Sequence, residues 1–296
     1  MSFLEKLRAE TPTLSFEFYP PKDKDGWGTL YSALGNISKR VPDYVTVTYG
    51  AGGSTRQKTV ELVSRIQDEL GIEAMAHLTC VGHSKAEITS ILDSLHQAGV
   101  RAIMALRGDP PQGQAAFEAH PDGFAHASDL IAFIRARWDF CLGCSFYPEK
   151  HLEAESLAHD IAFLKLKQDQ GADFAVSQIF FDNATFYEFR TLAQQAGVTI
   201  PLVAGIMPIT SLDQLGKTGI LQRAGTVIPA SLTAALGNGT KSEIVERGVD
   251  YAVAQCRDLL QNHTAGVHFY TLNRSTSSLR VTEALRADGY FPMPRK

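Results

Sequence analysis

The stretch that decides the fold is EAMAHLTCVGHSKAEITSILDSLHQAGVRAIMALR, residues 73–107. It opens with an apolar run of strand length, Glu73–Leu78, and continues over Ser84–Ala98 with apolar residues at helical spacing. Gly99 follows, where a helix end favours a left-handed residue, and Ala102–Arg107 is a second apolar run. The stretch therefore predicts a strand–helix–strand unit that joins two parallel strands.

Similar units follow one another along the whole chain. Strands are predicted at Leu14–Tyr19, Tyr44–Tyr49, Glu73–Leu78, Ala102–Arg107, Leu142–Tyr147, Phe174–Phe180, Pro201–Ile206 and Val267–Leu272. Helices are predicted at Gly26–Lys39, Thr55–Leu70, Ser84–Ala98, Ala127–Ala136, Glu155–Gln170, Asn183–Ala196, Ser211–Lys217, Lys241–Asn262 and Thr276–Ala287. Eight units close a (β/α)8 barrel, and the first strand lacks the G-x-G-x-x-G of an open dinucleotide-binding sheet. We expect a single TIM barrel, one domain over residues 1–296.

The composition limits the functions open to the chain. Its 296 residues include 28 Lys and Arg against 32 Asp and Glu, a net charge of −4, so we expect no nucleic-acid partner. Residues 1–10 carry charges where a signal peptide needs an apolar run, and no run reaches the ~20 residues that cross a bilayer. We expect a cytoplasmic protein with no membrane partner. Its four cysteines should be reduced, and Cys141 and Cys144 fit core packing better than a zinc or redox motif.

The first strand carries a carboxyl group that we expect inside the barrel. In the run Ser15–Tyr19, strand alternation puts Phe16 and Phe18 on one side and Glu17 on the other, toward the lumen. A carboxyl group between apolar walls resists ionisation and can serve as a general acid near neutral pH. The alternative is that Glu17 is a structural ion-pair partner.

Further polar residues fall at the expected C-terminal strand ends, where the active sites of such barrels lie. The fourth strand ends in Arg107-Gly108-Asp109, where the glycine allows a ligand to approach closely. The two charged residues either bind that ligand or tie down the loop as a pair. The sixth strand ends near Gln178 and the eighth near Tyr270, which supply an amide and an aromatic face.

A metal-dependent hydrolase or aldolase is the main alternative, since such barrels carry His and Asp at strand ends. His77, Asp109, His151 and His268 fall near expected strand ends, but the chain has no HxH or HExxH spacing. We therefore expect no metal site. A non-catalytic barrel that serves as a subunit or a ligand-binding scaffold is a further alternative, against which the presence of Glu17, Asp109 and Gln178 together argues.

Eight sequence blocks, taken together, resemble the methylenetetrahydrofolate reductase family of FAD-dependent enzymes. They are LSFEFYPPK, YVTVTYGAGGSTR, MAHLTC, ALRGDPP, SFYPEKHLEA, SQIFFD, GIMPI and HFYTLNR, in family order from residue 14 to residue 274. The resemblance implies a (β/α)8 barrel that binds FAD at the C-terminal strand ends, without the regulatory domain of the eukaryotic enzymes. It also implies reduction of 5,10-methylenetetrahydrofolate to 5-methyltetrahydrofolate by a ping-pong cycle, in which NADH or NADPH reduces the FAD and leaves before folate binds.

The resemblance also implies roles for individual residues. Glu17 would be the general acid that helps open the five-membered ring of the folate, and Asp109 would stabilise the developing cation and tune the flavin. Folate contacts are implied for Asp109, Gln178, Gln214, Tyr270 and Arg274. FAD contacts are implied for Thr48, Tyr49, Ala51, His77, Arg107, Gly108, Asp109, Ala127, Tyr147, His151, Ala154, Asp160 and Lys167.

Two features remain open at this point. Phe163 and Leu166 stand where bacterial members of the family carry Asn and Arg, which removes polar contacts to the adenosine half of FAD. Some relatives take electrons from other donors through an accessory electron-transfer subunit, so such a partner stays open beside NADH and NADPH. The oligomeric state is also open, with a homo-oligomer as one candidate.

Overall fold

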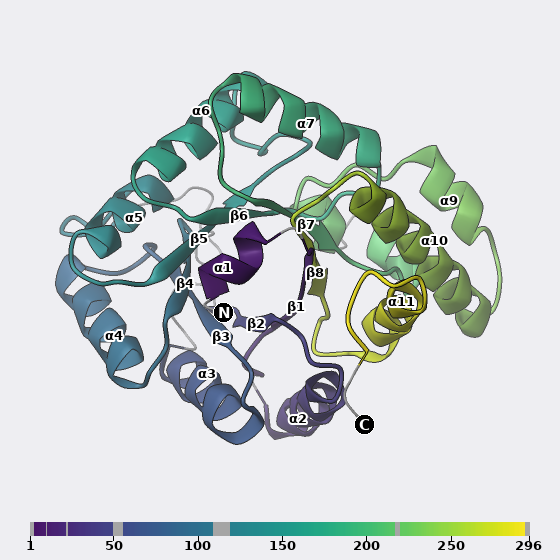
Figure 1. The fold of residues 1–296 in the computed structure, drawn as a ribbon, viewed down its shortest axis with the longest axis horizontal. Helices are drawn as coiled ribbons and strands as arrows, with labels where there is room; N and C mark the ends of the chain where they lie inside the picture. The colour runs from purple at the N-terminus through teal and green to yellow at the C-terminus, as the bar shows by residue number, and fades with distance from the viewer. Residues whose placement is uncertain are drawn as a thin grey trace.

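The computed structural model of the chain describes residues 3–9, 11–21, 23–49, 56–108, 119–216 and 220–293. Eight parallel strands close a barrel in chain order, with helices around it (Figure 1). The strands are β1 (Thr13–Phe18), β2 (Tyr44–Val47), β3 (Ala74–Thr79), β4 (Ala102–Leu106), β5 (Cys141–Phe146), β6 (Phe174–Ser177), β7 (Leu202–Ile206) and β8 (Gly266–Tyr270). The predicted (β/α)8 barrel and its eight strands are confirmed.

Residues 73–107 form the unit that their pattern predicts. Helix α4 (Lys85–Gln97) begins after Ser84, whose hydroxyl accepts a hydrogen bond from the Glu87 N–H while the Glu87 carboxylate accepts one from the Ser84 N–H. Buried side chains at positions 88, 91, 92 and 95 repeat at helical spacing, and each contributes about 1.5–3 kcal/mol. Gly99 has φ +80°, a left-handed conformation that ends the helix as expected.

The other helices mostly match their predicted ranges. They are α1 (Phe3–Arg8), α2 (Lys24–Ser38), α3 (Arg56–Leu70), α5 (Ala127–Arg135), α6 (Leu157–Asp169), α7 (Asn183–Gln195), α8 (Ile220–Arg223), α9 (Ala230–Leu236), α10 (Lys241–Gln261) and α11 (Thr276–Ala287). The patterns do not predict α1, α8 or α9, because each is too short to show a helical period.

The predicted helix Ser211–Lys217 is wrong. Residues Leu212–Leu215 form a single 3₁₀ turn, η2, because the side chains of Ser211 and Gln214 close a capping box around it. Gly216 then leaves in an extended conformation, φ −67° and ψ 158°, which ends the turn. Lys217 lies outside the described residues.

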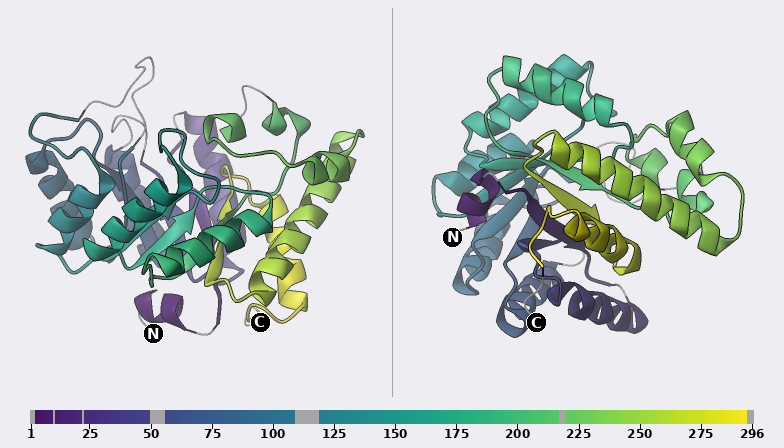
Figure 2. Two further views of the ribbon diagram at one scale, coloured as in Figure 1. Left: turned by 90° about the horizontal axis from the view of Figure 1, so that it is seen from above. Right: turned by 45° about the vertical axis from the view of Figure 1, so that its right-hand side comes forward.

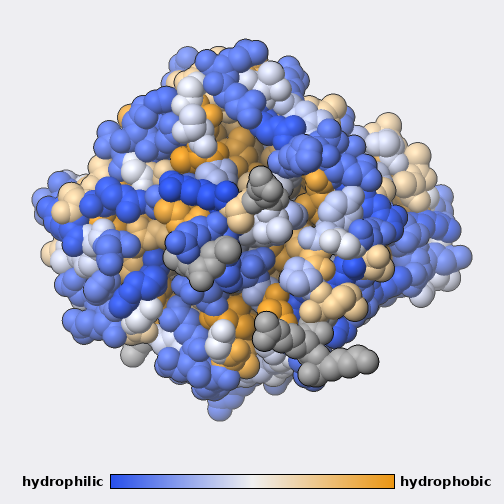
Figure 3. Space-filling model, in the orientation of Figure 1, coloured by the Kyte–Doolittle hydropathy of each residue, from blue (hydrophilic) through white to orange (hydrophobic). Residues whose placement is uncertain are grey.

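The interior of the barrel has an apolar end. At the N-terminal side of the strands α1 lies across the barrel (Figures 1 and 2). Side chains that point inward pack there with one residue of α1, and the cluster comprises Leu7, Tyr44, Met75, Ala102, Met104, Phe174, Val176 and Val203. On this face hydrophobic side chains show between the hydrophilic ones of the surrounding helices (Figure 3). Because this end is filled, a ligand must enter from the opposite end.

Two more apolar clusters complete the packing. The larger one lies between the barrel and the helices and includes Phe16 and Phe18 of β1. A smaller one, which includes Met207 and Leu232, joins the segment between β7 and α10 to the barrel, and Tyr270 packs against this cluster. Within the described ranges, no helix combines the length and the apolar character needed to span a bilayer.

Candidate active site

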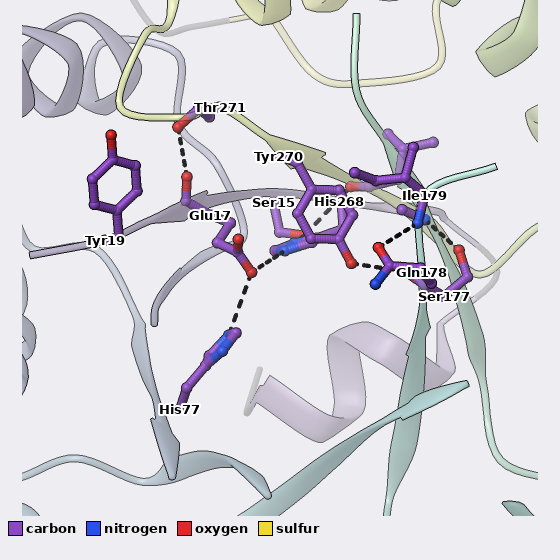
Figure 4. A network of polar contacts seen from close by, with 12 residues as sticks. Ser15, Glu17, Tyr19, His77, Ser177, Gln178, Ile179, His268, Tyr270 and Thr271 are labelled. Atoms are coloured by element: carbon purple, nitrogen blue, oxygen red, sulfur yellow. Dashed lines mark hydrogen bonds and ion pairs between the residues drawn. The ribbon is translucent and has the colours of Figure 1, made fainter. Parts of the chain in front are cut away.

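Glu17 lies inside the barrel, and its carboxylate faces two imidazoles. The Oε2 atom is 3.7 Å from Nε2 of His77 and 3.9 Å from Nε2 of His268 (Figure 4). The predicted orientation toward the lumen is confirmed, since Phe16 and Phe18 pack on the other side of the strand. The predicted apolar walls are wrong, because the alternation of β3 and β8 turns both imidazoles inward.

His77 is a neutral neighbour of Glu17 rather than a cationic one. Burial lowers the pKa of His77 to about 4, an effect that the Glu17 carboxylate opposes and His268 reinforces. Near neutral pH the pair is therefore a polar contact and not a salt bridge. The buried Nε2 of His77 forms no hydrogen bond with any described residue.

His268 is a residue of this site that the sequence interpretation weighed only as a metal ligand and did not place beside Glu17. Its Nδ1 lies 2.8 Å from the hydroxyl of Ser15, and its ring is stacked on Tyr44 at 6.3 Å. Only 1% of its surface is exposed. The signal was available, because His268 and Tyr270 are two residues apart on one strand and alternation puts them on the same face.

Tyr270 and Gln178 lie near Glu17 and the two imidazoles (Figure 4). The Tyr270 hydroxyl donates to the carbonyl of Ser177 at 2.8 Å, and burial raises its pKa well above the ordinary range, so the phenol stays protonated. The side-chain oxygen of Gln178 accepts from the N–H of Ile179 at 2.8 Å. Gln178 also lines a pocket formed by the segments 147–150, 178–179 and 224–226.

Several residues expected to contact FAD come together after β4 and β5. Arg107 forms a two-point ion pair with Glu153, at 2.5 and 3.0 Å, a partner that the sequence interpretation did not name. The ring of His151 lies edge-on to Tyr147 at 4.6 Å. Burial lowers the pKa of His151, and the nearby Arg107 adds to that effect.

The start of α6 extends this group. The Asp160 carboxylate accepts a hydrogen bond from the backbone N–H of His151 at 2.5 Å, and Lys167 donates to the carbonyl of Ser145 at 2.8 Å. The Ala154 carbonyl accepts from Lys150 at 2.6 Å. The residues of this second group thus come from two successive strand–helix loops, after β4 and after β5, and from α6.

Phe163 and Leu166 form an exposed part of α6. They are 36% and 39% exposed, and the Phe163 ring is stacked with His126 at 6.2 Å and tilted against His159 at 4.8 Å. The two side chains therefore present an aromatic and aliphatic surface on α6.

Asp109 and Ala51 lie outside the described residues. Gly108 is described, with φ +89°, and a Cβ there would lie 2.5 Å from Cγ1 of Val81. The close approach that this glycine allows within the described residues is to Val81 and Thr79, and its expected contact with FAD stays a prediction. A side chain would be strained at this φ as well.

The remaining predicted contact residues are spread around the barrel. Tyr49 is buried in the outer layer with its hydroxyl 3.2 Å from Nε2 of His83, while Thr48 directly follows β2 and Ala127 begins α5. The side-chain oxygen of Gln214 accepts from the N–H groups of Thr210 and Ser211. Arg274 is exposed just after β8. None of these predicted residues forms a hydrogen bond or ion pair with Glu17 among the described residues.

The histidines and cysteines are not arranged around a common centre. In the described part of the chain, no three His, Cys, Asp or Glu side chains are grouped as metal ligands. Cys144 is buried in the outer layer and Cys141 packs against the interior cluster, so the two point to opposite sides of β5. Burial raises the pKa of the Cys144 thiol to about 11.

Comparison with known proteins connects this barrel to one family. The family model of methylenetetrahydrofolate reductase matches residues 2–286. The chain is 36% identical over 301 residues to methylenetetrahydrofolate reductase (NADH) 1 of Arabidopsis thaliana, covering 95% of this chain and 50% of that protein. It is 34% identical over 275 residues to 5,10-methylenetetrahydrofolate reductase of Escherichia coli (strain K12), covering 92% and 90%.

Two further facts complete the comparison. The chain spans about half the length of the plant relatives that it matches. A solved structure from Clostridium thermocellum, of a protein described as binding two copies of 5-methyl-5,6,7,8-tetrahydrofolic acid, shares the fold with a TM-score of 0.67 and 15% identity, over 98% of this chain and 99% of that one. The family match and the bacterial relative together show that the chain belongs to the methylenetetrahydrofolate reductase family.

Proposed function

We propose that the chain reduces 5,10-methylenetetrahydrofolate to 5-methyltetrahydrofolate, with FAD as cofactor and NADH or NADPH as donor. The observation that carries the proposal is the carboxylate of Glu17, which lies inside the barrel 3.7 Å from His77 and 3.9 Å from His268. Membership of the reductase family supports this chemistry for the site.

Glu17 would act on the folate as a general acid. Its proton would pass to the ring nitrogen that leaves when the five-membered ring opens, and the carbon–nitrogen electron pair would stay on that nitrogen. The methylene carbon then forms an iminium with the other nitrogen, and it becomes a methyl group when it accepts hydride. General acids of this kind contribute roughly 10²–10⁴-fold in rate.

The neighbours of Glu17 would hold its side chain in place. His77 is neutral near pH 7, so it offers a nitrogen for hydrogen bonding and no positive charge. Tyr270 is fixed by its bond to Ser177 and presents its ring to the same space. Gln178, which directly follows β6, has an amide that suits the polar edge of a pterin.

The residues present fit a flavin at this end of the barrel. The buried Nε2 of His77 and the buried hydroxyls of Thr46 and Thr79 form no hydrogen bonds with described residues, which leaves polar atoms for a heterocycle on the walls of β2 and β3. Arg107, Asp160 and Lys167 are the groups that would hold the phosphates and a ribose. When bound, FAD would take hydride from the nicotinamide and supply it to the folate.

The alternative of a metal-dependent hydrolase or aldolase predicts a colourless protein. A bound oxidised flavin absorbs near ~450 nm as a property of the cofactor. We expect the purified protein to be yellow and to lose this absorbance when mixed anaerobically with NADH or NADPH. Addition of methylenetetrahydrofolate should then restore it, with one methyltetrahydrofolate formed per flavin. A protein that is reduced by neither nucleotide, or whose reduced flavin ignores the folate, contradicts the proposal.

A further inference from the structure

The seam between β1 and β8 closes the barrel, and it continues past the last paired residues through side chains. The backbone pairing of the two strands ends at Glu17 and Tyr270. Beyond it the hydroxyl of Thr271 donates to the carbonyl of Glu17 at 2.6 Å. The backbone of Glu17 is therefore held by the chain segment that follows β8.

Asn273 extends the same seam by two more hydrogen bonds. Its side-chain oxygen accepts from the N–H of Tyr19 at 3.0 Å, and its NH₂ donates to the carbonyl of Tyr19 at 2.8 Å. A backbone N–H can only donate and a carbonyl can only accept, so the partners fix which way the amide points. The Asn273 amide thus takes the place of a strand neighbour for Tyr19.

The backbone is in a demanding conformation to make these contacts. Leu272 and Asn273 have φ values of +49° and +59°, a left-handed region that Asn tolerates and Leu rarely adopts. Two local bonds hold the turn, from the Asn273 N–H to the Thr271 hydroxyl at 3.1 Å and from the Arg274 N–H to the Thr271 carbonyl at 2.9 Å. Conformations of this kind persist only where their surroundings fix them, and they gather at functional sites.

The side chains of this turn lie either in the seam or on the surface. Asn273 is only 4% exposed and lies in the seam, whereas Leu272 is 36% exposed and Arg274 is also exposed. An ordinary extended strand would have put Leu272 and Asn273 on alternating faces without returning the amide to β1. The left-handed pair is therefore what brings the Asn273 amide onto the β1 backbone beyond Glu17.

We propose that Asn273, supported by Thr271, is a positioning residue for the acid Glu17. The hydrogen bonds from Thr271 to Glu17 and between Asn273 and Tyr19, here called the clamp, fix the backbone on both sides of Phe18. The Glu17 carboxylate therefore keeps its place between the two imidazoles while the folate binds. The inference rests on the proposed function and adds a requirement to it. Proton delivery to the folate should depend on the clamp, whereas reduction of the flavin by the nucleotide should not.

Asn273→Asp is the sharpest test. Aspartate has the size of asparagine and also tolerates positive φ, but its carboxylate cannot donate a hydrogen bond to the Tyr19 carbonyl. We expect folate-dependent reoxidation of the reduced flavin to slow at least tenfold, with flavin reduction by NADH or NADPH within about twofold of wild type. Amide hydrogen exchange at Tyr19 should become faster. Asn262→Asp is the matched control, the same change at an exposed residue that caps α10.

Thr271 supplies a second pair of variants in case Asn273→Asp folds poorly. Thr271→Ser keeps the hydroxyl and should retain the folate half-reaction, whereas Thr271→Val should slow it selectively. Folded variants with wild-type rates in both half-reactions, or with equal losses in both, would overturn the positioning role. If wild-type protein reduced by the nucleotide left the folate unchanged, the proposed function itself would fall and the positioning role with it.

Discussion

The two ends of the barrel interior differ in composition. At the end covered by α1, Phe174, Met104 and Leu7 fill the space with apolar side chains, and Gly143 leaves room for the Phe174 ring, which a Cβ would meet at 2.6 Å. At the other end the same alternating strands present Glu17 and His77. With the proposed function at the polar end, we expect stability and chemistry to be separated along the strand axis, so substitutions at the two ends should affect different measurements.

The largest expected effect is on the chemistry of the polar end. Glu17→Gln removes the acid but keeps the size of the side chain, so folate reduction should fall by roughly 10²–10⁴-fold. Flavin reduction by NADH or NADPH should be preserved. Anaerobic stopped-flow absorbance measures the two half-reactions separately. Equal loss in both would contradict the role of the residue.

The opposite result is expected at the apolar end. Phe174 is fully buried, and Phe174→Ala should lower the free energy of unfolding by about 3–5 kcal/mol because it leaves a cavity. Urea unfolding followed by circular dichroism measures this loss. Both half-reactions of the folded variant should keep their rates. A selective loss of folate reduction, with unfolding unchanged, would break the separation between the two ends.

The polar end should lower the acid stability of the fold. His77 has an ordinary pKa of 6.5 and a folded pKa of about 4, so the unfolded chain takes up the proton first as the pH falls. The contribution of neutral His77 to the free energy of unfolding is intact above pH 6.5 and is lost progressively toward pH 4, a change of up to about 3 kcal/mol. His77→Gln should therefore lose less stability than wild type between pH 6.5 and 4 in urea titrations. His159→Gln, at an exposed residue, is the control and should follow wild type.

The smallest effect is expected at Gln214, outside the barrel interior. Its side-chain oxygen is already held by the N–H groups of Thr210 and Ser211, so mainly its NH₂ could serve a folate. Gln214→Ala should raise the KM for methylenetetrahydrofolate roughly 2–10-fold and lower the free energy of unfolding by about 1 kcal/mol. Steady-state kinetics and urea unfolding measure the two effects. A change in kcat of a hundredfold would instead place Gln214 among the reacting groups.

The sequence was informative wherever a local period decides the outcome. Helical spacing and the glycines that follow the helices predicted the βα units. Strand alternation predicted that Glu17 points inward, because neighbouring side chains on a strand must point to opposite sides. It failed in the segment after β7, where η2, α8 and α9 are too short to show a period. That segment nevertheless builds the apolar cluster behind Tyr270.

By itself, the sequence determined the order and number of the strands, and therefore the barrel, because each unit is set by residues close together in the chain. Only the tertiary structure decided what surrounds Glu17. His77 and His268 come from β3 and β8, and the clamp from Asn273 comes from the far end of the chain. Such neighbours meet only when the barrel closes, since register and closure depend on pairing between distant strands and leave no local pattern to read.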